Sequence, residues 1–240
     1  MAEIRVLADA SALADAAAAH FVEAAAAALS RQARWAVALS GGATPRAAYQ
    51  RLAAPDLARQ VDWSRVHFFW GDERCVPPDH TDSDYGMARE ALLGHIPVPA
   101  ANIHRMRGEL DPAQAADDYQ AELQRFFGPA LPRFDLVWLG LGEDGHTASL
   151  FPGTAALHET QRWVAANWVE RLQTWRLTLT PPVLNHAAQV TFLVSGSPKT
   201  QILQAVMKGP YQPDVHPAQL VQPTSGHLLW LIDRAAAAQL

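Results

Sequence analysis

Short apolar runs alternate with segments of helical character along this chain. Four of the runs cover residues 35–39, 66–70, 134–139 and 189–194, and each is five or six residues long. Nearly continuous apolar runs of this length are typical of strands that are buried on both faces of a sheet. The runs therefore predict four central strands, and residues 1–8 and 228–232 predict two more.

Helices are predicted between these strands. Asp9 or Ser11 can cap a helix that runs to about residue 32, in which alanine supplies the helix propensity. Pro45 suits the first turn of a helix that ends near Leu52. Further helices are expected over residues 83–93 and 111–127, after residue 199, and over residues 233–240.

The alternation of strands and helices predicts a fold class. Right-handed crossovers between the strands give an α/β, Rossmann-like, mostly parallel sheet with helices on both faces. Residues 163–169 and 173–179 are too close together for a helix to connect them, so we expect a small antiparallel strand element there. Because no repeat, linker or charge run marks a boundary, residues 1–240 are expected to form a single domain.

Composition narrows the class of protein. Of 240 residues, 49% are hydrophobic and 18% are charged, which excludes a disordered or fibrous chain. A net charge of −5 gives no electrostatic footprint for nucleic acid or for an anionic membrane. Asp15, His20 and Glu23 interrupt the alanine-rich segment 10–29, so neither a signal peptide nor a membrane span is expected. With one cysteine and no disulfide, we expect a cytoplasmic protein.

Polar loops that contain glycine follow four of the predicted strands. They are Ser-Gly-Gly at 40–42, Gly-Asp-Glu-Arg at 71–74, Gly-Leu-Gly-Glu-Asp-Gly-His at 140–146, and Ser-Gly-Ser-Pro-Lys at 195–199. The carboxyl ends of parallel strands lie along one edge of a sheet, where ligands bind. A solvated turn explains any one of these loops, but it explains all four poorly. We therefore expect them to converge on one pocket.

The first loop has the features of an anion site. Gly41 and Gly42 let the backbone approach a ligand, and the helix from Pro45 directs its free N–H groups into the loop. Ser40 and Thr44 add hydroxyl donors, which makes phosphate the preferred anion. A helix cap with a tight turn is an equally simple interpretation of this loop taken alone.

The loop at 140–146 holds the candidate catalytic pair. Its glycines match the dinucleotide pattern G-x-G-x-x-G, but Glu143 and Asp144 would repel a pyrophosphate, so we reject that interpretation. Asp144 can instead orient His146, and an oriented neutral imidazole is a general base near neutral pH. A histidine alone is more often structural, but this one lies in a strand-end loop.

Several charged residues at or near strand ends are candidates to bind an anionic substrate. Arg74, Arg176 and Lys199 are the cations, and Asp72 lies beside the first of them. A surface ion pair is the alternative for each. A metal site built from Asp72, Glu73, Asp144 and His146 would lack the histidine cluster that zinc prefers, so no metal is expected.

At these residues the chain resembles the 6-phosphogluconolactonases over nearly its whole length. The most specific segment is residues 139–153, Leu-Gly-Leu-Gly-Glu-Asp-Gly-His-Thr-Ala-Ser-Leu-Phe-Pro-Gly. Segments 39–45, 70–77, 176–180, 194–199 and 226–233 follow in the family's order. The related glucosamine-6-phosphate deaminases continue differently after the histidine. Asp84 is a departure, because the family more often has Ser-Asn-Tyr where this chain has Ser-Asp-Tyr.

The resemblance implies hydrolysis of 6-phospho-D-glucono-1,5-lactone to 6-phosphogluconate, a step of the oxidative pentose phosphate pathway, without a metal or organic cofactor. His146 is the expected base and Asp144 its partner. Substrate binding is expected from Ser40, Gly41, Gly42, Thr44, Asp72, Arg74, Arg176 and Lys199. The alternatives are a glucosamine-6-phosphate deaminase or isomerase, and a sugar-phosphate-binding module without catalysis. A monomer is the working expectation.

Overall fold

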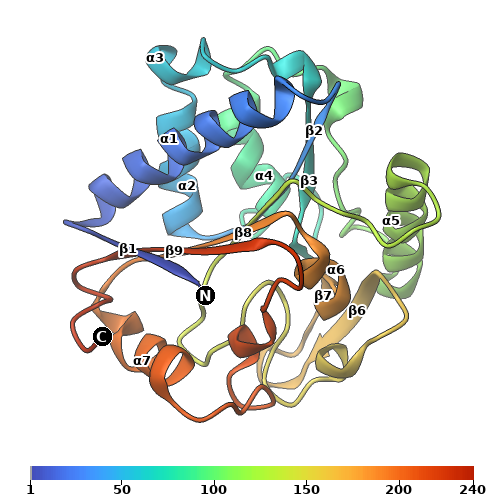
Figure 1. Cartoon of the computed structure of the whole chain (residues 1–240). Coiled ribbons are helices and arrows are strands. Elements are labelled where there is room, and N and C mark those ends of the chain that lie inside the picture. Colours follow the sequence, from blue (N-terminus) through green and yellow to red (C-terminus); the bar gives the residue numbers. More distant parts are fainter. Residues whose placement is uncertain (1) are drawn as a thin grey trace.

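The structure of the protein is a computed structural model that describes residues 2–240. Six parallel strands form the main sheet in the order β1-β9-β8-β5-β2-β3, and a smaller antiparallel sheet has the order β4-β7-β6 (Figure 1). The main-sheet strands are β1 Glu3–Leu7, β2 Trp35–Leu39, β3 Val66–Trp70, β5 Leu136–Leu139, β8 Gln189–Val194 and β9 His227–Asp233. The fold class predicted from the sequence, including the small antiparallel element, is confirmed.

The α-helices connect these strands and cover the sheet. They are α1 Ala10–Leu29, α2 Ala43–Leu52, α3 Pro55–Ala58, α4 Asp84–Ala88, α5 Pro112–Phe127, α6 Pro181–His186 and α7 Thr200–Lys208. In Figure 1, α1 lies on one side of β1 and β9 and α7 on the other. Asp9 caps α1 by accepting a hydrogen bond from the backbone N–H of Ala12, as the sequence predicted.

Helix α1 is long and unusually apolar. By length and composition alone its 20 residues could cross a membrane, because an 18-residue window within them has a mean hydropathy of 1.3. Core helices of globular proteins meet the same criterion, so the expectation that the chain has no membrane span stays a prediction. In the structure, however, its apolar face is part of the core. Phe21 packs against Trp35, Phe68 and Trp138 of three central strands, with ring centroids 4.7–6.4 Å apart. This is the packing of a core helix in a globular domain.

The small sheet places charged residues at the end of β3. Strands β6 Val164–Val169 and β7 Thr174–Leu179 form the predicted antiparallel pair, and β4 Asp72–Arg74 adds to β7. We expected the residues of β4 to form a loop, but Asp72 pairs with Thr178 and Arg74 with Arg176 in the ladder. The strand-end segment after β3 is therefore held rigidly by backbone hydrogen bonds.

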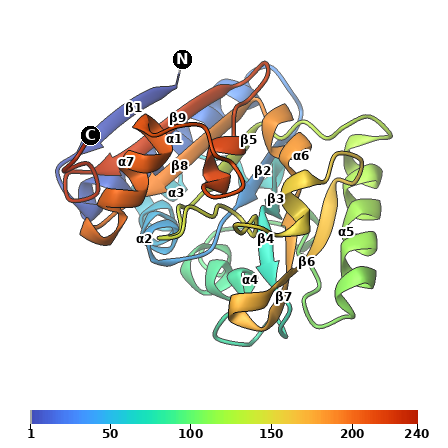
Figure 2. The same ribbon diagram turned by 90° about the horizontal axis from the view of Figure 1, so that it is seen from below.

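The order of strands fixes where the loops meet. From β2 the chain crosses to β3 on one side, whereas β5 lies on the other side of β2 and leads to β8 and β9. This reversal is the topological switch point at which open α/β sheets bind ligands. The loops after β2 and β5 flank it directly, and Figure 2 shows the small sheet with β4 lying at this end of the molecule.

The predicted helix over residues 233–240 is wrong, because Asp233 ends β9 and residues 234–239 form turns. The Asp233 carboxylate accepts hydrogen bonds from the Ser195 hydroxyl, the Gly196 N–H and the Ala236 N–H. Alanine propensity cannot extend so short a segment into a helix without further packing. The turn serves instead to hold the loop that follows β8.

Candidate active site

The four strand-end loops converge on one pocket of about 210 Å³. Residues from β4, from the start of α4 and from the loops after β2, β5 and β8 line it: Ser40, Gly41, Gly42, Asp72, Arg74, Asp84, Gly140, Leu141, Gly142, His146, Thr147, Ala148 and Lys199. A cavity of about 480 Å³ lies elsewhere, along α5, but there Arg105 and Arg125 are already paired with Glu109 and Glu122. The smaller pocket is therefore the candidate site.

The loop after β5 presents His146 to this pocket. Gly145 adopts a φ of +83°, and the Gly142 N–H donates to the backbone oxygen of His146 at 2.8 Å, which closes a tight turn. A Cβ atom on Gly142 would lie 2.0 Å from Nδ1 of His146. The imidazole thus occupies the space that a side chain at 142 would need, so this turn requires glycine.

Asp144 holds the imidazole in a defined orientation. Its Oδ1 pairs with Nδ1 of His146, and it also accepts the backbone N–H of His146 at 3.2 Å. One face of the imidazole stacks on the Phe151 ring, with the ring centroids 4.1 Å apart. With Nδ1 committed to the carboxylate, Nε2 is the nitrogen left to act as a base.

Arg171, at the tip of the β6–β7 hairpin, completes this arrangement. Its guanidinium lies 2.8 Å from Oδ2 of Asp144 and 5.5 Å from the Phe151 ring centroid. Burial alone would raise the pKa of Asp144, but hydrogen bonds and charge from His146, with a contribution from Arg171, lower it to about 2. Asp144 is therefore ionised at neutral pH and stabilises positive charge on the imidazole.

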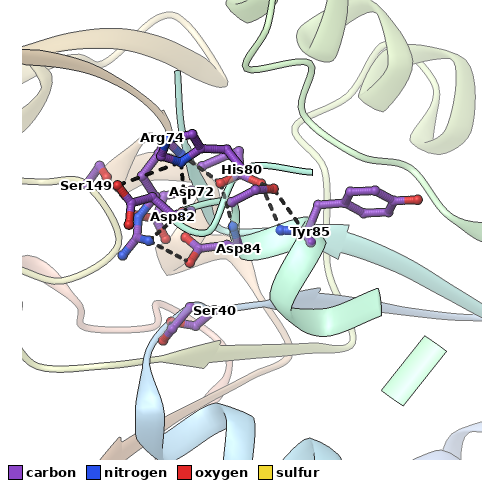
Figure 3. Close-up of polar contacts among 12 residues, drawn as sticks. Ser40, Asp72, Arg74, His80, Asp82, Asp84, Tyr85 and Ser149 are labelled. Carbon is purple, nitrogen blue, oxygen red and sulfur yellow. Dashed lines mark hydrogen bonds and ion pairs between the residues drawn. The ribbon is translucent and has the colours of Figure 1, made fainter. Parts of the chain in front are cut away.

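Opposite this loop, β4 contributes Asp72 and Arg74 (Figure 3). Oδ2 of Asp72 accepts the Ser149 hydroxyl at 2.7 Å. The Arg74 guanidinium donates to the backbone oxygen of Asp82 at 2.7 Å and lies 3.2 Å from Oδ1 of Asp84. Both side chains are thereby fixed before any ligand binds.

Between Asp72 and Arg74, the buried Glu73 organises the following loop. Its Oε1 accepts the backbone N–H groups of Arg74 and Asp84, and its Oε2 accepts the Ser83 hydroxyl and the Tyr85 N–H, at 2.7–3.1 Å. In Figure 3 the ring of Tyr85 points away from this cluster. Glu73 is a structural carboxylate that positions the start of α4 at the pocket wall.

The glycine-rich loop after β2 forms another wall. Tyr49 of α2 anchors it, because its hydroxyl accepts the Ser40 N–H at 3.1 Å and donates to the Ser40 carbonyl at 2.8 Å. Gly42, the N-cap of α2, has a φ of +99°, which favours glycine. Lys199 faces the pocket from the β8 loop, with Nζ 3.9 Å from Glu143.

Seven of the ten predicted site residues line the pocket, and three do not. Ser40, Gly41, Gly42, Asp72, Arg74, His146 and Lys199 are part of the wall, and Asp144 lies behind His146. Thr44 is the second residue of α2 and does not line the pocket. Arg176 is paired with Arg74 across the β4–β7 ladder, and burial followed by repulsion from Arg74 lowers its pKa.

Asp84, Thr147 and Ala148 also line the pocket, although the sequence did not predict this. The departure from Asn at position 84 was the one signal that pointed to any of them. Among residues 2–240, no three His, Cys, Asp or Glu side chains are grouped to hold a metal ion.

Comparison with known proteins identifies the family. The sequence profile described as glucosamine-6-phosphate isomerases/6-phosphogluconolactonase matches residues 8–230. The chain belongs to this family. Family membership agrees with the resemblance seen in the sequence.

Individual relatives of this family match over most of the chain. A 6-phosphogluconolactonase of Nostoc sp. is 42% identical over 217 residues, covering 89% of this chain and 88% of the relative. One of Synechocystis sp. is 44% identical, covering 85% and 84%. The solved structure of 6-phosphogluconolactonase from Trypanosoma brucei has a TM-score of 0.88 at 31% identity, covering 100% of this chain and 99% of that one.

Proposed function

We propose that this chain hydrolyses 6-phospho-D-glucono-1,5-lactone to 6-phosphogluconate, the lactonase step of the oxidative pentose phosphate pathway, with His146 as the general base. The observation that carries the proposal is the Asp144–His146 pair, which opens into the same pocket as Lys199 and the glycine-rich loop. The relatives named 6-phosphogluconolactonase, matched over most of their length, support the same activity.

The reaction needs one proton to be moved twice. Nε2 of His146 takes a proton from water as the water oxygen attacks C1 of the lactone, and a tetrahedral oxyanion forms. When the bond from C1 to the ring oxygen breaks, the imidazolium returns the proton to that oxygen, which becomes the hydroxyl at C5. Asp144 stabilises the imidazolium between these two transfers, because it is ionised and bonded to Nδ1.

Binding energy comes from the opposite walls. Lys199 and the N–H groups at the start of α2, next to Gly41 and Gly42, provide positive potential for a phosphate. Arg74 supplies a second cation for either the phosphate or the carbonyl oxygen. Holding the remote phosphate fixes the ring relative to His146, so binding energy is used to orient the reacting carbonyl.

The experiment is a coupled assay that supplies fresh δ-lactone and measures 6-phosphogluconate above the spontaneous rate. His146→Ala is expected to lower kcat by roughly 10²–10⁴-fold with little change in KM, since a positioned base contributes about this much. His158→Ala is the matched control, because that histidine is 71% exposed and pairs with Asp214. Unchanged turnover in His146→Ala would remove His146 from the mechanism.

Two further measurements separate the alternatives. Release of ammonia from glucosamine 6-phosphate would indicate the deaminase activity of the wider family, and binding without turnover would indicate a sensor. A structure described as a monomeric glucosamine-6-phosphate deaminase shares the fold at 17% identity, with a TM-score of 0.84. A monomeric state and a cytoplasmic location stay predictions. Relatives from Arabidopsis thaliana and Oryza sativa are named chloroplastic.

A further inference from the structure

Asp84 is a buried carboxylate that the proposed mechanism does not use. It begins α4, lines the pocket, and is 2% exposed. Its Oδ1 faces Arg74 at 3.2 Å, whereas Oδ2 is buried and has no hydrogen-bond partner among residues 2–240. A Cβ atom on Gly41 would lie 1.7 Å from Oδ1, so the glycine-rich loop packs directly on this side chain.

The charges around Asp84 do not favour its ionised form. The titratable groups that face it are Asp72, Glu73 and Arg74 on β4, Arg176 on β7, and Tyr49 on α2. Burial raises the pKa of Glu73 as well, but its two oxygens accept four hydrogen bonds, which oppose that rise and favour the ionised form. With Asp84 ionised as well, three carboxylates would face two guanidinium groups. With Asp84 neutral, the cluster balances.

Hydrogen bonding indicates the same state. An ionised carboxylate whose second oxygen has no donor is costly when buried, because nothing replaces its lost hydration. Burial, followed by the negative charge of Asp72, raises the pKa of Asp84 well above its ordinary value, and Arg74 opposes this only in part. A proton on Oδ2 leaves Oδ1 as the acceptor that holds Arg74.

We propose that Asp84 stays protonated in the working enzyme and so positions Arg74 without neutralising its charge, which is left for an anionic oxygen of the substrate. The inference rests on the proposed lactonase function. An ionised Asp84 would pair with Arg74 and repel a phosphosugar, whereas the neutral acid has the shape and the acceptor of an asparagine. Asp84 is thus a positioning residue that makes binding of the anion depend on pH.

The test is calorimetric binding of 6-phosphogluconate, which does not hydrolyse, to the wild type and to Asp84→Asn between pH 5.5 and 8.5. Wild-type Kd is expected to rise with pH by up to tenfold per unit once Asp84 ionises, since one proton is lost. Asp84→Asn is expected to bind within about threefold of the wild type at pH 6 and to lack this rise. Titration of the phosphate affects both proteins equally, so the ratio of their Kd values isolates Asp84.

Two further variants keep the result interpretable. Asp84→Leu removes the acceptor for Arg74 and is expected to raise Kd and KM at least tenfold at every pH with a smaller change in kcat. Asp79→Asn, an exposed residue of the same loop, is expected to match the wild type. The proposal is overturned if Asp84→Asn binds more than tenfold more weakly than the wild type at pH 6, if the wild-type Kd falls relative to that of Asp84→Asn as pH rises, or if Asp84→Leu binds normally. Equal Kd values up to pH 8.5 would show that Asp84 keeps its proton over the whole range.

A spectroscopic measurement separates this inference from the proposed function. The infrared difference spectrum between the wild type and Asp84→Asn at pH 6.5 is expected to show the carbonyl band of a protonated carboxylic acid. An absent band overturns the inference whether or not the protein hydrolyses the lactone. A present band in a protein without lactonase activity would instead refute the proposed function alone.

Discussion

Replacing Asp144 with Asn removes one negative charge while keeping the size of the side chain. In the wild type, burial raises the pKa of Asp144, but the contacts with His146 and Arg171 outweigh it and lower this pKa from 3.8 to about 2. A shift of this size corresponds to about 2.5 kcal/mol. Because the pair is partly exposed, solvent screening reduces it to about 1–2 kcal/mol.

The loss of Asp144 affects catalysis in two ways. The lost charge no longer stabilises the imidazolium, and about 1–2 kcal/mol corresponds to roughly a 5- to 30-fold loss of rate. In addition, the amide of Asn can donate to Nδ1 of His146 and so select the wrong tautomer, a change that costs about 10⁴-fold in serine protease triads. We therefore expect kcat of Asp144→Asn to fall at least tenfold in the coupled lactonase assay.

The depressed pKa of Asp144 should also make the stability of the fold depend on pH. Since the folded-state pKa of Asp144 is depressed, its contribution to folding is present above about pH 4 and is lost as pH falls toward 2. In urea unfolding followed by tryptophan fluorescence, Asp144→Asn is expected to be about 1–2 kcal/mol less stable at pH 6, with the difference shrinking at pH 3. Glu143→Gln, a 69% exposed neighbour, controls for the charge change. A kcat within threefold of the wild type, or a stability difference independent of pH, would refute this reasoning.

Three other changes test separate parts of the site. Gly41→Ala should lower kcat/KM at least tenfold, because its Cβ would lie 1.7 Å from Asp84, an overlap that the buried side chain relieves only at a cost of about 1–3 kcal/mol. Arg171→Met should lower kcat about two- to fivefold, since the Arg171 side chain is 57% exposed and water screens its pair with Asp144 to about 1 kcal/mol. Glu73→Gln should lower the free energy of unfolding by about 2–4 kcal/mol in urea titration, because its NH2 group would face two donors.

Matched controls exist for each of these changes. At Gly71 an added Cβ would lie 3.5 Å from the nearest atom, so Gly71→Ala should keep normal kinetics. Arg107 is exposed like Arg171 and lies 3.8 Å from Asp118, and Arg107→Met should leave kcat unchanged. Glu23→Gln, on the exposed surface of α1, makes the same change and should alter stability by less than about 0.5 kcal/mol. Equal effects in a variant and its control would show that the contact named for that variant is not responsible.

The central strands could be predicted from the sequence because buried strands require continuous runs of apolar residues. Residues 35–39, 66–70 and 189–194 form strands with the predicted bounds, since a fully buried parallel strand needs a continuous apolar run. Strand β4 carries no such signal. Its Asp-Glu-Arg sequence becomes a strand only because it pairs with β7, which is about a hundred residues away in the chain.

The positions of the site residues were predictable only as far as they depend on strand ends. His146 and Lys199 follow their strands directly, and the topology brings them together. Arg176 was placed by the same reasoning, but its neighbour in the ladder is Arg74 and it does not line the pocket, a detail set by register. Asp84 could not be placed because a buried carboxylate, Glu73, folds its loop back onto the glycine-rich turn.

The glycines of the loop after β5 match the dinucleotide pattern G-x-G-x-x-G, but in this protein they are needed for another reason. In a dinucleotide site such glycines make room for a pyrophosphate. Here a Cβ on Gly142 would strike the imidazole of His146, and Gly145 provides a φ of +83° for the turn that carries it. At Gly41, likewise, Asp84 occupies the space that a Cβ atom would need. The glycines at this pocket therefore make room for the protein's own functional side chains, and this explains why the glycine pattern can resemble a nucleotide-binding motif while Glu143 and Asp144 exclude a pyrophosphate from the same loop.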